Sequence, residues 1–559
     1  MKISRRSFLG TVSATGAAMA FPAGRDVPIL RIGVMTDTHI NKYPETCSRI
    51  KAAWELFRSF RTDAVFNLGD IADRFIEQAY VNYRKTVNAV KAGGAWNPEE
   101  LYVWAFHDAY DYHGSKDRGI PHRHEAFVEA ARLLESPNGE FAVREWKGFP
   151  FLVFPQFIDP KDFAAQYEAP IKKAIAEHPG KPVFVLDHIP PKDTVQNSDT
   201  HGDRRRRGIL ERYPQAVVLT GHVHGSIRNE TFAWQGAFTV FNFGCLQKWG
   251  GGLVGGIHGG FDSYGVGMLE IYPDRIVVRR FNDVRKPDDE EQPWVMPWPF
   301  DPASAPYSLK AKRRSPAPAF PAGAKLEISA DGKAESELSL RFPEAAGAYL
   351  YRIEDEKGFY AETFSQFHLD RQSRGQNDVK IPLARFAERG QCRFSVAPVG
   401  FAGQLGKSMS AQAILPPDVQ QVKEIVFESS DPMHELKREW ASWCKPIEPD
   451  AEGFLVMKYG DDVSLRLPEG LFDRFDNKAR FRAVADVTVD TPDGVHFSIG
   501  LRRKTPQYWF TREKVRSGRG VKVRIVSAIK IIPGTRDLSY WASLADGKFR
   551  FDSIRIVRI

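Results

Sequence analysis

The sequence has few cysteines, no long hydrophobic run and no low-complexity block, and each absence argues against a class of protein. Its four cysteines, among 559 residues, lie far apart and form no C-x-x-C pair. This spacing argues against a disulfide framework or a zinc ribbon, although it allows one bridge in an oxidising compartment. Beyond the N-terminus, no segment approaches the roughly 18 apolar residues that span a bilayer. A composition of 42% hydrophobic and 26% charged residues is that of a folded, globular chain.

Positive charge exceeds negative charge without being gathered into one arm. The formal net charge is +8, and the surplus is spread over the whole length. Arg204–Arg207 is the one dense basic run. A solvated helix start is the simpler interpretation of that run, and contact with an anionic substrate is the alternative. The sequence therefore predicts no nucleic-acid-binding arm.

The first residues have the features of a targeting segment. Ser4-Arg5-Arg6-Ser7-Phe8-Leu9-Gly10 is a twin-arginine pattern, and Ala18-Met19-Ala20 is a small-x-small cleavage site. We expect residues 1–24 to be a signal peptide, with an uncleaved anchor as the alternative. The prediction is export by the twin-arginine route to the periplasm or the extracellular space, with no transmembrane segment after the signal.

The remaining chain divides by its pattern into an α/β part and two all-β parts. From about Ile29, short β-rich runs alternate with amphipathic stretches, which predicts a layered α/β domain over 27–283. Residues 284–323 are rich in proline and charge and are expected to be a linker or a strap, packed through Trp294 and Trp298. Short strand signals then predict an immunoglobulin- or fibronectin-like β-sandwich over 324–418. A jelly-roll-like sandwich resembling carbohydrate-binding domains is predicted over 419–559.

Four short segments of the α/β part place metal-ligand residues at the ends of predicted strands. They are a D-x-H after Val34, a G-D after Leu68, a single histidine after Leu186 and a G-H-x-H after Leu219. Each pattern alone is common. Their succession along one domain predicts a metal centre, because loops at strand ends can meet at one edge of a sheet. The candidate ligands are Asp37, His39, Asp70, His188, His222 and His224.

In their order these segments resemble the motifs of the calcineurin-like metallophosphoesterase superfamily, over about residues 30–282. The family order is D-x-H, G-D-x-x-D, G-N-H-D/E, H and G-H-x-H. The resemblance implies a four-layer α/β/β/α sandwich with a two-metal site, here followed by two all-β sandwich domains. It implies one metal on Asp37, His39 and His224, a second on His188 and His222, and a bridging Asp70. A mixed nitrogen and oxygen ligand set suits Fe, Mn or Zn without choosing among them.

One motif departs from the family pattern. Where the family has G-N-H-D/E, this chain has Ala105-Phe106-His107-Asp108. Phenylalanine cannot replace the asparagine ligand, so we expect a weakened second site or one completed by water or a neighbouring residue. By resemblance, His107 would donate a proton to the leaving group or stabilise its charge, with Asp108 orienting it.

The resemblance implies hydrolysis of a phosphomonoester or phosphodiester by a metal-bound hydroxide. The predicted partner is a phosphoester substrate. A carbohydrate-linked phosphoester is the narrower option, and the C-terminal domain would position it. The alternative, motivated by Phe106, is a degenerate phosphoesterase scaffold that serves as a cell-surface glycan-binding protein.

Overall fold

The computed structural model describes most of the chain, in the following segments: residues 27–40, 47–73, 76–105, 107–109, 132, 134, 141–249, 261–262, 264–288, 290–330, 337–357, 359–365, 375–386, 390–416, 423–436, 448–457, 462–476, 478–490, 497–503, 508–515, 518–527, 537–543 and 547–558. These residues form two compact units. The first is built from residues up to Val195, Asp203–Gln247 and Ser263–Pro316, and the second mainly from Ala317–Ile559.

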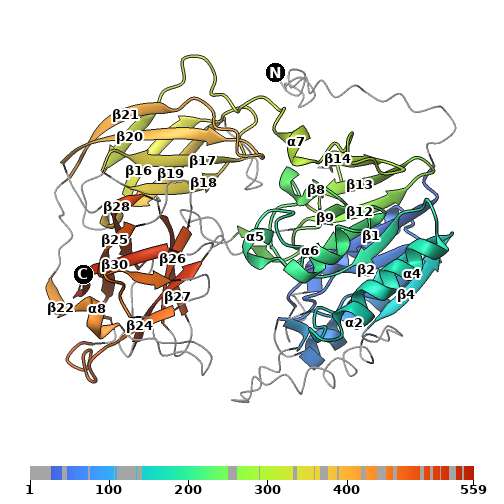
Figure 1. Cartoon of the computed structure of the whole chain (residues 1–559), viewed down its shortest axis with the longest axis horizontal. Coiled ribbons are helices and arrows are strands. Elements are labelled where there is room, and N and C mark those ends of the chain that lie inside the picture. The colour runs from blue at the N-terminus through green and yellow to red at the C-terminus, as the bar shows by residue number, and fades with distance from the viewer. Residues whose placement is uncertain are drawn as a thin grey trace. The chain divides into compact units, whose positions relative to one another are not determined.

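The first unit contains two six-stranded sheets, named here the β1 sheet and the β6 sheet (Figure 1). The β1 sheet has the order β14-β13-β12-β1-β2-β3, and the β6 sheet has the order β4-β5-β6-β7-β9-β8. The strands of the β1 sheet are β1 (Leu30–Met35), β2 (Ala64–Asn67), β3 (Glu99–Tyr102), β12 (Val266–Ile271), β13 (Arg275–Phe281) and β14 (Glu290–Pro297). Those of the β6 sheet are β4 (Ala142–Trp146), β5 (Phe149–Val153), β6 (Val183–Leu186), β7 (Ala216–Thr220), β8 (Ala233–Gln235) and β9 (Thr239–Asn242).

Successive side chains of a strand point to opposite faces of its sheet, so each sheet can pack against the other sheet on one face and against helices on the other. Ile32 and Val34 of β1 belong to a buried core shared with Phe151 and Val185 of the β6 sheet. Residues that face the opposite side of the β1 sheet pack with the helices α1 (Ser48–Ser59) and α2 (Ile76–Lys91). On the β6 sheet, a π-helical turn η4 (Ala164–Glu168) runs into α4 (Ala169–Glu177), and α6 (Arg204–Leu210) follows. The order helix, sheet, sheet, helix confirms the predicted α/β/β/α sandwich.

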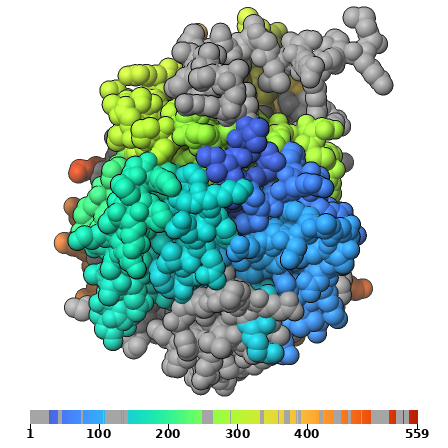
Figure 2. Space-filling model, turned by 90° about the vertical axis from the view of Figure 1, so that its right-hand side faces the viewer, coloured from blue at the N-terminus to red at the C-terminus, as the bar shows by residue number. Residues whose placement is uncertain are grey.

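The β1 sheet is built from two separate parts of the chain. Strands β1–β3 precede the strands of the β6 sheet in sequence, and β12–β14 follow them. In Figure 2, the blue early segments lie beside the cyan segments that follow Phe141, on one face of the first unit. Neighbouring strands β1 and β2 are parallel, as are β6 and β7. Their carboxyl ends therefore lie at one edge of each sheet, where loops can carry functional side chains.

The segment expected to be a linker over 284–323 contributes a strand. Residues 290–297 form β14, which pairs antiparallel with β13 at the edge of the β1 sheet. Trp294 is buried at 1% exposure and stacks on Phe241, with ring centroids 5.8 Å apart. The Trp298 indole N–H donates to the Gly180 carbonyl at 2.9 Å. Edge strands tolerate proline, because only one side of an edge strand must donate hydrogen bonds to the sheet.

The second unit is all-β and contains two pairs of sheets. In the first pair, a three-stranded sheet (β15-β16-β19) and a four-stranded sheet (β18-β17-β20-β21) share one core. The strands are β15 (Glu327–Ala330), β16 (Glu337–Pro343), β17 (Leu350–Asp355), β18 (Tyr360–Phe364), β19 (Gln376–Pro382), β20 (Gly390–Val399) and β21 (Met409–Leu415).

The second pair likewise encloses one core. Strands β22-β30-β25-β28, with β23 added to β30, face the sheet β24-β29-β26-β27. The strands are β22 (Glu424–Glu428), β23 (Leu455–Met457), β24 (Asp462–Arg466), β25 (Phe481–Asp490), β26 (Phe497–Arg503), β27 (Tyr508–Val515), β28 (Arg519–Val526), β29 (Asp537–Ser543) and β30 (Gly547–Arg558). The predicted pair of all-β sandwich domains is thus confirmed. Among the described helices, none is both long and apolar enough to cross a bilayer.

Candidate metal centre

The six predicted ligands lie just beyond the carboxyl ends of four strands. Asp37 and Asp70 follow β1 and β2, whereas His188 and His222 follow β6 and β7. The ligand atoms gather in two groups that share Asp70. All six residues therefore lie together at the edge of the first unit where these parallel strands end.

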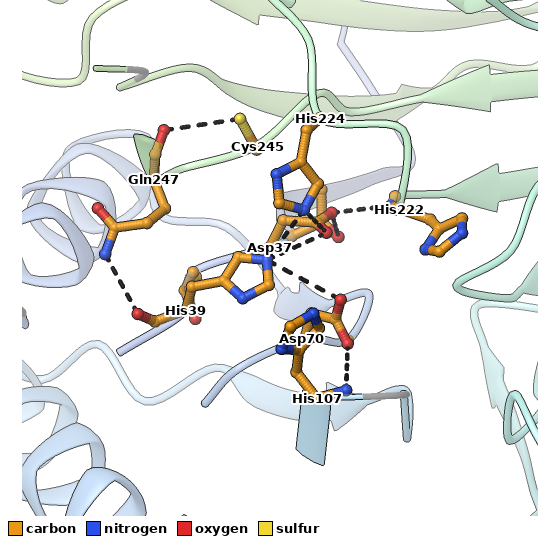
Figure 3. A network of polar contacts seen from close by, with 12 residues as sticks. Asp37, His39, Asp70, His107, His222, His224, Cys245 and Gln247 are labelled. Atoms are coloured by element: carbon orange, nitrogen blue, oxygen red, sulfur yellow. Dashed lines mark hydrogen bonds and ion pairs between the residues drawn. The ribbon is translucent and has the colours of Figure 1, made fainter. Parts of the chain in front are cut away.

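The first group contains Asp37, His39, Asp70 and His224, whose ligand atoms lie within 4.8 Å of one another. The His224 Nε2 atom is 2.9 Å from Asp37 Oδ1 and 2.9 Å from His39 Nε2 (Figure 3). His39 Nε2 is 3.6 Å from Asp37 Oδ1 and 3.9 Å from Asp70 Oδ2. Ligands about 2.1 Å from one ion stand roughly 3.0–3.4 Å apart, so these atoms surround a space of the size of a metal ion.

The second group contains Asp70, His188 and His222. His188 is wholly buried, and its Nδ1 lies 2.8 Å from the Leu68 carbonyl oxygen, which accepts the Nδ1 proton. That hydrogen bond leaves Nε2 free of a proton for ligation. Nε2 lies 3.2 Å from Asp70 Oδ2, and the His188 and His222 rings are 5.1 Å apart.

The backbone of these loops is held in an uncommon conformation. Among the described residues, nine other than glycine have positive φ, and five of the nine are candidate ligands. They are Asp37 (50°), His39 (39°), Asp70 (51°), His222 (71°) and His224 (37°). Such conformations cost free energy and concentrate at functional sites, because the surrounding structure must enforce them.

Two glycines next to ligands leave no room for a side chain. A Cβ on Gly69, whose φ is +103°, would lie 2.6 Å from the Ala105 Cβ and 2.9 Å from His188 Nδ1. A Cβ on Gly221 would lie 2.0 Å from the Thr36 hydroxyl and 2.5 Å from Asp37 Oδ2. Both positions therefore require glycine so that the loops can approach one another.

The site is strongly charged in the absence of an ion. Burial by itself would raise the pKa of Asp37, but His224 and His188 outweigh it and hold that pKa well below its ordinary range. Burial also acts to raise the pKa of Asp70, and His188 more than reverses it. Burial would lower the pKa of His188, yet Asp70 and Asp37 raise it to about 10. The two carboxylates therefore favour a positive charge at this place, which a bound metal ion would supply.

Two buried polar atoms fit the presence of a cation. Asp37 Oδ1 and His188 Nε2 are both inaccessible to solvent, and neither has a hydrogen bond of acceptable geometry among the described residues. The other polar atom of each of these two side chains, Asp37 Oδ2 and His188 Nδ1, makes hydrogen bonds. Asp37 Oδ2 accepts from the Thr36 hydroxyl at 2.7 Å and from the His222 amide at 2.9 Å. Imidazole and carboxylate donors arranged in this way suit a transition-metal ion.

His107 lies beside this centre, but its carboxylate partner differs from the expected one. Its Nδ1 is 3.2 Å from Asp73 Oδ1, and its amide donates to Asp70 Oδ1 at 2.9 Å. Asp108 Oδ1 accepts instead from the amides of Ile71 and Ala72 and from the Tyr80 hydroxyl. The structure thus corrects the assignment of Asp108 as the orienting residue. The Asp73 carboxylate faces the ring, and Asp108 fixes the loop after Asp70.

Sequence reasoning assigned no role to Asp73, although it is the last residue of the G-D-x-x-D segment. The loop after β9 was also missed. Gln247 Nε2 donates to the His39 carbonyl at 3.2 Å (Figure 3). The Leu246 amide donates to the Thr36 carbonyl at 3.0 Å. Phe106, on which the expectation of a weakened second site depends, lies outside the described residues.

Comparison with known proteins gives one family match and several distant structural likenesses. The model of the calcineurin-like phosphoesterase family matches residues 30–226. Among curated proteins, none matches this chain. A 5'-nucleotidase precursor from Thermus thermophilus is 12% identical, with a TM-score of 0.25, over 51% of this chain and 57% of its own.

A second likeness concerns a smaller part of the chain. The C-terminal CBM6 of LamC from Zobellia galactanivorans is 15% identical, with a TM-score of 0.15, over 24% of this chain and 94% of its own. At these TM-scores neither structure bears on the function of the chain.

Proposed function

We propose that this chain, which carries a calcineurin-like phosphoesterase domain over residues 30–226, is a metal-dependent hydrolase of phosphomonoesters or phosphodiesters. The observation that carries the proposal is the convergence of six ligand residues in two groups that share Asp70. A carboxylate with two oxygens can serve two ions at once, and no other described residue belongs to both of these groups.

The chemistry that two ions would supply at this site is polarisation of the phosphoryl oxygens of the substrate and activation of water as the nucleophile. Asp37, His39 and His224 would hold one ion and His188 and His222 the other. The chain's own residues supply the remaining steps. His107, at the rim of the first group, would donate a proton to the departing oxygen, and Asp73 would hold its ring in position.

Substitution of the shared ligand tests the proposal. In Asp70→Ala we expect the loss of both ions and a fall in kcat/KM of at least about 10³-fold, because both groups lose a ligand. Metal content per chain and turnover of p-nitrophenyl phosphate and its bis-ester would be measured on the same samples. Asp159→Ala is the matched control, since this aspartate is exposed and pairs only with Lys161 among the described ion pairs.

Two outcomes would count against a hydrolase. Full activity in a metal-free Asp70→Ala protein would refute the metal-dependent mechanism. A wild-type protein that binds two ions but turns over neither substrate class would favour the alternative, a degenerate scaffold that binds glycans. The intact ligand geometry supports the hydrolase.

A further inference from the structure

Arg204–Arg207 begins a helix, as predicted, but Arg206 is buried behind the second ligand group, so the interpretation as a solvated face is wrong at this residue. Its side chain is 1% exposed. The helix that carries it, α6, begins at Asp203, whose carboxylate accepts from the Arg205 and Arg206 amides. Arg205 keeps the exposed position that the sequence predicted, at 48% side-chain exposure.

The Arg206 guanidinium contacts acceptors with all three of its nitrogens. Nε donates to Asp187 Oδ2, and Nη1 donates to Asp203 Oδ2 at 2.8 Å. Nη2 donates to the Gln156 carbonyl at 3.1 Å and lies 3.4 Å from the Pro155 carbonyl. A planar fork with five donors can serve four acceptors in fixed directions, which a lysine ammonium cannot do.

These contacts hold the loop of His188 from both sides. Asp187 directly precedes His188 and is itself fully buried, and its other oxygen, Oδ1, has no hydrogen bond of acceptable geometry among the described residues. Beyond His188, the Asp203 amide donates to the Pro190 carbonyl at 3.0 Å, and the Lys192 amide donates to the Asp203 carbonyl at 3.1 Å. Arg206 therefore joins the residue before His188 to the segment after it.

The same guanidinium reaches the loop that leads to His107. Pro155 and Gln156 follow β5, and the Gln156 amide donates to the Trp104 carbonyl at 2.9 Å. Trp104 follows β3 and lies three residues before His107. The rings of Phe163 and Tyr167 flank the guanidinium, with centroids 5.4 and 5.5 Å from its carbon.

We propose that Arg206 is a positioning residue for the second metal, which fixes His188 through Asp187 and Asp203. The proposal rests on the proposed function only in requiring a second ion. Outer residues that orient a ligand typically change metal affinity by about 10–100-fold when they are removed. The acceptors that Arg206 contacts in the described part of the chain include no ligand of the first group, so the first ion should be unaffected.

Metal affinity measured without any substrate tests the proposal. Full-length Arg206→Lys and Arg206→Met proteins would be titrated with Zn²⁺ or Mn²⁺ against a chromogenic chelator. We expect the first dissociation constant to stay within about twofold of wild type and the second to rise roughly 10–100-fold, less in Arg206→Lys than in Arg206→Met. Arg205→Met, changed at the neighbouring exposed position, should match wild type.

Wild-type affinities for both ions in Arg206→Lys would overturn the proposal, whether or not Arg206→Met folds. Equal weakening of both ions, together with a lowered melting temperature, would also overturn it, because that pattern belongs to a purely structural ion pair. A wild-type protein that binds two ions without turnover would refute only the hydrolase.

Discussion

Asp73 and Asp108 show how two carboxylates close to one histidine take different roles. Asp108 directly follows His107 in the sequence, whereas Asp73 ends a motif 34 residues earlier; of the two, Asp73 faces the ring, with 3.2 Å between its Oδ1 and His107 Nδ1. Burial acts to lower the pKa of His107, but the Asp73 carboxylate, as acceptor for the ring, and the charge of Asp70 raise it above its ordinary value. A raised pKa favours the protonated ring, which is the form that a proton donor requires.

Substitution of Asp73 should therefore change the pH dependence of hydrolysis. A protonated His107 is lost as the pH rises through its pKa, so this pKa sets the alkaline limb of kcat/KM. In Asp73→Asn the raising contribution of this carboxylate is removed, and we expect the alkaline limb to move to lower pH. The shift should be clear with phenyl phosphate, whose leaving group needs a proton, and small with p-nitrophenyl phosphate.

The alkaline limbs of Asp73→Asn and wild type can be compared with ions bound, because the ions act on the pKa of His107 in both proteins. An unchanged alkaline limb with phenyl phosphate would contradict the assignment of Asp73 as the residue that holds His107.

Among the structural elements, β14 differs most from its sequence-based assignment. Pro293, Pro297 and the acidic run before them predicted a linker or a strap packed through Trp294 and Trp298, and did not predict a strand. The strand nevertheless forms because it lies at a sheet edge and because Trp294 finds a deep pocket. Its indole N–H lies 3.1 Å from Glu230 Oε2, and the Arg280 guanidinium lies 4.5 Å from its ring centroid.

Truncation of this side chain should destabilise the first unit. Trp294→Ala removes a fully buried aromatic ring, and we expect a loss of about 3–5 kcal/mol in the free energy of unfolding. Chemical denaturation followed by tryptophan-independent circular dichroism would measure it. Leu309→Ala, at a site 48% exposed, should stay within about 0.5 kcal/mol of wild type. Equal stability of the two variants would show that β14 is dispensable.

The candidate ligands could be predicted from the sequence, whereas the residues that position them could not. Asp37, Asp70, His188 and His222 were found because each follows a short β-rich run, and chain periodicity records strand ends. The pairing of Asp73 with His107 and the burial of Arg206 depend on which loops meet in space. No local pattern records such contacts, and four consecutive arginines are on local grounds a solvated face.

On the scale of the whole molecule, the candidate metal centre draws its residues from both sheets of the first unit. Asp37, His39 and Asp70 follow strands of the β1 sheet, and His188, His222 and His224 follow strands of the β6 sheet. All candidate metal-binding groups among the described residues belong to the first unit. A bound ion should therefore stabilise that unit alone.

Removal of metal should lower one thermal transition and leave another unchanged. At an ion concentration 100 times the dissociation constant, binding stabilises the folded state by about 2.7 kcal/mol. We expect chelation to lower the melting temperature of the first unit by several degrees, as measured by calorimetry, without shifting the transition of the second. Asp70→Ala should lack this response, and a chelator effect that persists in it would contradict the assignment.

The strand order of the β1 sheet has a consequence for biosynthesis. β1, which carries the D-x-H loop, lies between β2 and β12, so one of its neighbours is translated more than two hundred residues after it. A ribosome that has just completed the G-H-x-H segment has supplied every ligand but has left β1 with an open edge. Nascent chains halted there, and recombinant fragments cut at residue 226, should pair through that edge and aggregate. A fragment of the first unit that covers this edge must extend at least through β12.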